Sequence, residues 1–71
     1  MQYGTVIYID PEGRGYGFIE ADERSSAVDI FFNGRGVIGR KFDDLHVGDR
    51  VSFEIGDGHK GPHAINVVKL D

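Results

Sequence analysis

The sequence predicts an all-β fold, a single small barrel of five short antiparallel strands. Eleven glycines in 71 residues indicate many turns and short strands rather than helices. Between the turns lie short stretches rich in β-branched and aromatic residues, which are typical of strands. No stretch offers a helix long enough to cover an open sheet, and closing the sheet into a barrel removes its exposed edges.

The first half of the chain predicts three strands joined by hairpins. We expect the first strand at residues 3–9. The sequence Asp10-Pro11-Glu12-Gly13 follows it and has the chemistry of a turn, because proline presets φ and glycine tolerates positive φ. A second strand is expected at 14–20, a charged, Ser-rich hairpin loop at 21–27, and a third strand at 28–33.

The second half predicts a long connection and two further strands. Gly34, Gly36 and Gly39, in the connection at 34–49, oppose a regular helix, so residues 42–45 form one helical turn at most. Residues 50–55 alternate cleanly, with Val51, Phe53 and Ile55 on one face. Residues 56–62 are expected to be a flexible turn, and residues 64–69 the fifth strand. The expected core comprises Val6, Ile19, Ile30, Phe32, Val37, Leu45, Val51, Ile55 and Val67.

Length and composition predict one soluble, cytoplasmic domain over residues 1–71. The chain has no cysteine, which excludes disulfides, thiolate zinc sites and thiol nucleophiles. Its apolar runs are too short to span a membrane, and no signal peptide is visible. The net charge of −4 argues against a nucleic-acid partner. However, five cations fall in or beside loops around the aromatic strands, and a locally positive face stays possible: Arg14, Arg35, Arg40, Lys41 and Lys60.

The segment Arg14-Gly15-Tyr16-Gly17-Phe18-Ile19 carries the main functional signal. Alternation in a strand places Tyr16 and Phe18 on one face beside Arg14, while Ile19 points to the core. Residues 29–33 are likewise apolar on both faces. Because the chain lacks helices to cover a second face, one set of aromatic rings faces water. Such a row beside a cation is a stacking platform for nucleic-acid bases.

These segments resemble the cold-shock domain family over essentially the whole chain. Residues 14–19 are similar to its first ribonucleoprotein motif, Lys-Gly-Phe-Gly-Phe-Ile, and residues 29–33 stand where its second motif, Val-Phe-Val-His-Phe, begins. Leu45, Gly48 and residues 51–54 match Leu-x-x-Gly-x-x-Val-x-Phe. Residues 60–67 match Arg/Lys-Gly-Pro-x-Ala-x-Asn-Val. Four motifs in the right order make the resemblance specific.

The resemblance implies a five-stranded Greek-key barrel of the oligonucleotide-binding (OB) type. It further implies binding of single-stranded RNA or DNA with little sequence preference, as an RNA chaperone. Separately, nothing in the sequence suggests an obligate dimer, so we expect a monomer, with no cofactor, no small-molecule substrate and no membrane partner. Arg14 and Lys60 would supply cations near the backbone, His63 a contact at the rim, and Asn33 the place of the second motif's histidine. The implied stacking residues are Tyr8, Tyr16, Phe18, Phe31 and Phe42.

The sequence also departs from the family pattern within the implied platform. Tyr8 stands in place of the usual tryptophan and Ile9 in place of phenylalanine, while Gly34 replaces the phenylalanine that ends the second motif. Stacking is worth about 1–3 kcal/mol per base. We therefore expect weaker binding or a shorter footprint on an unchanged fold.

A second hypothesis keeps the barrel but changes its partner. The altered second motif and the acidic balance also suit a diverged barrel whose exposed aromatic patch contacts a protein. Salt separates the two hypotheses, because phosphate contacts weaken steeply with salt and aromatic protein contacts do not. An RNA-recognition-motif fold is excluded, since it needs two helices.

Other chemistries receive little support from the sequence. His59 and His63 are four residues apart but flank Gly61-Pro62 in a loop, with no third ligand at useful spacing for a metal. The glycines at 13, 15 and 17 precede no helix that could complete a phosphate site. No nucleophile–base pair is recognisable, so the sequence predicts no enzyme.

Overall fold

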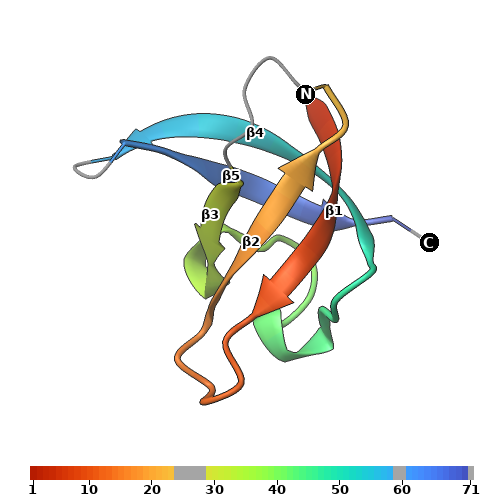
Figure 1. Ribbon diagram of the computed structural model, residues 1–71, viewed down its shortest axis with the longest axis vertical. Helices are drawn as coiled ribbons and strands as arrows, with labels where there is room; N and C mark the ends of the chain where they lie inside the picture. Colours follow the sequence, from red (N-terminus) through yellow and green to blue (C-terminus); the bar gives the residue numbers. More distant parts are fainter. Residues whose placement is uncertain (24–28, 59–60, 71) are drawn as a thin grey trace.

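A computed structural model describes residues 1–23, 29–58 and 61–70, and these form the predicted all-β barrel (Figure 1). The sheet closes on itself in the order β1-β2-β3-β5-β4. Within the described ranges, no helix is long and apolar enough to cross a membrane. The strands are β1 (Gln2–Ile9), β2 (Tyr16–Ala21), β3 (Ile30–Asn33), β4 (Arg50–Gly58) and β5 (Gly61–Lys69).

One pair of neighbouring strands is parallel, so the prediction of an entirely antiparallel barrel was wrong at that point. β1–β2, β2–β3, β4–β5 and β1–β4 pair antiparallel, whereas β3 and β5 pair parallel. The cause is geometric: strand direction cannot alternate around a closed ring with an odd number of members. The hairpins and the β1–β4 contact take the antiparallel pairings, and β3–β5 is the pair left over.

The connection between β3 and β4 contains two short 3₁₀ turns, η1 (Gly34–Gly36) and η2 (Phe42–Asp44). The second turn is the single helical turn expected at 42–45. The first was not expected. It forms because the Asn33 side chain caps it, its Oδ1 accepting a hydrogen bond from the Arg35 N–H at 3.0 Å.

Strand ends differ from the sequence-based bounds for local reasons. β2 begins at Tyr16, because the Asp10 carboxylate accepts backbone hydrogen bonds from Glu12 and Arg14 and holds residues 10–14 in a loop. β4 runs on to Gly58 and β5 starts at Gly61, so the flexible turn expected at 56–62 was wrong for most of its length. Most of the expected 21–27 loop, together with the start of the expected third strand, lies outside the described residues.

The barrel interior confirms most of the predicted core. Ile30 and Val37 are half-buried and pack against its edge. Ile55 was predicted wrongly, since its side chain is 40% exposed. β1 pairs with β4 only from Arg50 to Phe53, so Ile55 lies past the end of the paired part of β1. The buried apolar residues are Val6, Ile19, Phe32, Leu45, Val51, Phe53, Ala64 and Val67.

Candidate nucleic-acid interface

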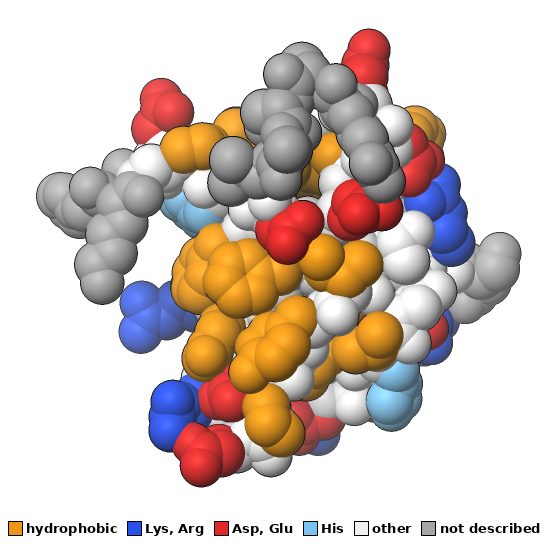
Figure 2. Space-filling model, in the orientation of Figure 1, with side chains coloured by type: hydrophobic (Ala, Val, Ile, Leu, Met, Phe, Trp, Pro, Cys, Tyr) orange, Lys and Arg blue, Asp and Glu red, His pale blue; other side chains and the backbone are white. Residues whose placement is uncertain are grey.

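Four aromatic rings gather on the outer face of β1, β2 and β3, and we call them the aromatic platform: Tyr8, Tyr16, Phe18 and Phe31. Adjacent ring centroids lie 5.8–6.3 Å apart, at the spacing of contacting aromatic side chains. Figure 2 shows hydrophobic side chains as a continuous patch at the centre of the face that β2 and β3 present to the viewer. Tyr8 is 40% exposed and Phe31 37%, which leaves ring surface free for a ligand.

Strand register brings the rings of β2 and β3 together. Phe18 lies directly opposite Phe31, and Tyr16 lies two residues before Phe18 on the same face. Between them, Gly17 points inward opposite the buried Phe32. The alternation in the sequence predicted this part of the platform.

Tyr8 reaches the platform through a β-bulge that sequence reasoning missed. Val6 pairs with Ile19, but Tyr8 pairs with Phe18, so β1 has two residues opposite one residue of β2. By simple alternation Tyr8 would share the inward face of Val6. The extra residue, Ile7, turns the Tyr8 ring outward to within 5.9 Å of the Phe18 ring. Only the family resemblance pointed to Tyr8, because no local pattern marks the bulge.

Two more of the implied contact residues line up with the platform. His63 on β5 lies opposite Phe31, which extends the row across β1, β2, β3 and β5. Asn33 lies opposite Tyr16 at the end of β3, with its Oδ1 held by the Arg35 N–H.

Phe42 is not part of this row. It sits in η2, partly buried, with its ring 5.5 Å from the ring of the fully buried Phe32. Its side chain also lies against the backbone of Gly34. Lys60, the other predicted cation, lies outside the described residues.

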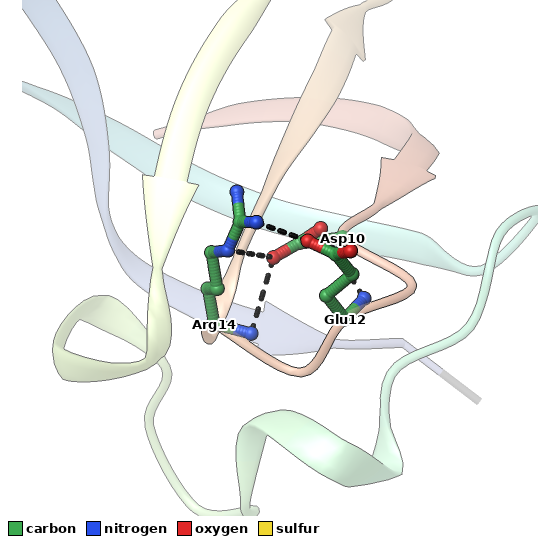
Figure 3. A network of polar contacts seen from close by, with 3 residues as sticks. All are labelled: Asp10, Glu12 and Arg14. Carbon is green, nitrogen blue, oxygen red and sulfur yellow. Dashed lines mark hydrogen bonds and ion pairs between the residues drawn. The ribbon is translucent and has the colours of Figure 1, made fainter.

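The charge of Arg14 acts on Tyr8 of the platform. The guanidinium is already engaged by acids of its own loop (Figure 3). Its Nη2 pairs with Oε2 of Glu12, and its Nε lies 3.8 Å from Oδ2 of Asp10. In Figure 2, Lys and Arg side chains flank the hydrophobic patch on the left and lower left, and Asp and Glu side chains border it above. The surroundings of the platform are therefore of mixed charge.

The hydroxyl of Tyr8 is electrostatically tuned by its neighbours. Desolvation by the surrounding protein raises the pKa of Tyr8 above its usual 10.0, and the hydroxyl and carboxyl groups of Tyr16 and Asp10 raise it further. The charge on Arg14 acts in the opposite direction.

A closed five-stranded barrel with a row of solvent-exposed aromatic rings defines a class of small protein that binds nucleic acid on the outside of its sheet. Comparison with known proteins identifies the class more closely. Residues 2–70 match the model of the 'Cold-shock' DNA-binding domain. The chain therefore belongs to the cold-shock domain family, whose members bind nucleic acid.

Full-length relatives agree with this assignment. The chain is 46% identical over 70 residues to the cold shock protein CspB of Geobacillus stearothermophilus, covering 99% of this chain and 100% of the relative. It is 43% identical to the major cold shock protein of Micrococcus luteus and 41% identical to the cold shock protein CspD of Bacillus subtilis, with the same coverage.

Proposed function

We propose that this protein binds single-stranded RNA or DNA by stacking unpaired bases on the aromatic platform. The observation that carries the proposal is the unbroken contact of four rings on one exposed face, at 5.8–6.3 Å. Stacking needs only the π-face that every base has, so sequence preference is modest. His63 and Asn33 border the rings, where they contact bases or backbone at the rim.

The same binding gives an RNA-chaperone activity without catalysis. A protein that binds only unpaired strands shifts the equilibrium between paired and unpaired RNA by mass action. This activity needs neither a cofactor nor a small-molecule substrate, and a monomer in the cytoplasm can perform it. The relatives are named cold shock proteins, which supports a role at low temperature, where paired RNA is most stable.

The double variant Phe18→Ala/Phe31→Ala tests the platform directly. Each lost stacking contact costs about 1–3 kcal/mol, so affinity for a labelled oligopyrimidine DNA falls at least about thirtyfold in fluorescence anisotropy. The matched control is Tyr3→Ala, which removes a ring that is 48% exposed but is not part of the platform. Circular dichroism establishes that both variants fold. Normal binding by the folded double variant would refute the proposal.

Salt dependence distinguishes nucleic-acid binding from a protein-binding role for the same patch. Tyrosine fluorescence reports binding directly, because the chain has three tyrosines and no tryptophan. We expect oligopyrimidine DNA to quench it, and the affinity to fall with salt by a log–log slope of about −0.7 for each phosphate contacted. No quenching at any salt concentration would favour a protein partner instead.

A further inference from the structure

We infer that Glu12 competes with nucleic-acid phosphate for Arg14, and so limits the affinity of this face. The inference rests on the proposed function. In the free protein Nη2 of Arg14 pairs with Oε2 of Glu12. Nε of the same guanidinium faces Oδ2 of Asp10 at 3.8 Å. The Nε–Nη2 edge, one of the edges with which arginine grips phosphate through two hydrogen bonds, is thus turned toward carboxylates (Figure 3).

The two acids of this cluster have different roles. Asp10 is only 5% exposed, and its carboxylate accepts the N–H groups of Glu12 at 3.3 Å and Arg14 at 3.1 Å. Its carbonyl oxygen accepts the Gly13 N–H at 3.2 Å. Asp10 therefore builds the loop and cannot leave it. Within the described part of the chain, the Glu12 side chain makes no such hydrogen bond to backbone N–H groups, and it is 64% exposed, so Glu12 is the acid that a ligand can displace.

The cluster lies at one end of the platform. The Asp10 N–H donates to the carbonyl oxygen of Tyr16 at 3.0 Å, which fixes the loop at the Tyr8–Tyr16 end of the ring row. Two carboxylates and one guanidinium give the loop a net negative charge. A phosphate arriving there meets repulsion unless Glu12 moves away from Arg14.

Carboxylate and phosphate bind a guanidinium through the same charge-assisted hydrogen bonds, so one excludes the other. Replacing Glu12 by glutamine removes the competing charge and keeps the side-chain size. We expect Glu12→Gln to bind oligopyrimidine DNA about two- to fivefold more tightly, the equilibrium factor of an exposed ion pair. Its log–log salt slope becomes steeper by about 0.7, as for one additional phosphate contact.

The experiment compares wild type, Glu12→Gln, Arg14→Gln and the double variant by anisotropy of labelled oligopyrimidine DNA over a series of salt concentrations. Glu54→Gln is the matched control. It changes the net charge equally, lies on β4 away from the platform, and retains a side-chain oxygen that can accept the hydrogen bond from Asn66 Nδ2. The inference predicts that affinity and salt slope increase in Glu12→Gln but not in Glu54→Gln. It also predicts that Glu12→Gln no longer changes the salt slope when Arg14 has been replaced, so that Arg14→Gln and the double variant have the same slope.

Two results would overturn it. Equal behaviour of Glu12→Gln and Glu54→Gln means that only net charge matters. A slope change that persists without Arg14 means that Glu12 acts by another route. Phe18→Ala/Phe31→Ala keeps these failures separate from failure of the proposed function. If that variant loses binding while Glu12→Gln resembles its control, the platform stands and only the role of Glu12 is wrong.

Discussion

Gly17 lies between the platform residues Tyr16 and Phe18 and faces the buried Phe32 of the core. A Cβ atom added there would overlap the carbonyl oxygen of Tyr8 and would lie 3.0 Å from the Phe32 ring. The first of these is backbone, which cannot yield without moving β1 away from β2. We expect Gly17→Ala to lose about 1–3 kcal/mol of unfolding free energy, the usual cost of overpacking.

Urea denaturation followed by circular dichroism measures the loss. Gly34→Ala is the control, because the nearest atom to its added Cβ is Phe42 Cβ at 3.4 Å, an ordinary contact. A Gly17→Ala variant as stable as the control would show that the β1–β2 pair tolerates displacement.

Tyr8 couples the platform to pH at the alkaline end. Its pKa is raised above 10.0 in the folded protein, chiefly by desolvation, so the folded state holds the phenolic proton more tightly than the unfolded state does. This contribution to stability is fully present below about pH 10 and is lost as pH rises through the folded pKa. We expect the free energy of unfolding to fall across that window in wild type and to fall less in Tyr8→Phe. Parallel pH profiles of the two proteins would contradict this.

At the scale of strands, the alternation of residue types predicted which face a side chain occupies wherever the strands pair regularly. It gave the wrong face where a β-bulge interrupts the pairing. Tyr16, Phe18 and Phe31 follow from strict period-two alternation and could be placed from sequence. Tyr8 could not, because the bulge at Ile7 reverses its face without any residue type that signals it. The prediction for Ile55 was wrong for a different reason: the burial of its side chain depends on how far β1 extends along β4, which is a tertiary property.

β5 carries a second irregularity, and it depends on Asn66. Ser52 pairs with Val68 and Glu54 with Ile65, so β5 has an extra residue opposite Phe53. Asn66 has φ of 52°, in the left-handed region that asparagine tolerates better than other non-glycine residues. Its Nδ2 also donates to Glu54 Oε2 at 2.9 Å.

We expect Asn66→Ala to lose about 1–2 kcal/mol of unfolding free energy, because the Cβ of alanine disfavours the left-handed conformation and the hydrogen bond to Glu54 is lost. Asn66→Gly, which lacks the same hydrogen bond but adopts positive φ freely, should be the more stable of the two. Chemical denaturation of both variants checks the order. The reverse order would show that the left-handed conformation at residue 66 carries no appreciable cost for alanine.

For the whole molecule, two of the described carboxylates have lowered pKa values and contribute to the response to acid. The Asp49 carboxylate accepts the His46 N–H at 2.9 Å, which lowers the pKa of Asp49 below 3.8, with help from Lys69 at 3.5 Å. Hydrogen bonds from Arg50 likewise lower the pKa of Asp22. A lowered pKa adds stability above the usual 3.8, and this stability is lost as pH falls through the folded value.

Asp49→Asn should therefore be less stable than wild type near neutral pH, with a smaller difference in strong acid. Denaturation midpoints at about pH 7 and about pH 2 measure this. Asp43→Asn, on the exposed η2 turn, removes one charge without breaking these contacts. A stability difference that stays constant with pH would exclude the carboxylate as its source.

The parallel β3–β5 pairing has a consequence for the free and bound states. The barrel closes where short β3 meets β5, and the pair of residues at this closure is Phe31 and His63. A nucleic-acid strand stacked on Phe31 and touching His63 would contact both β3 and β5 and so bridge their pairing from outside. Occupancy should then slow amide hydrogen exchange in β3 and the facing part of β5 more than elsewhere, because opening of this pairing would first require release of the ligand.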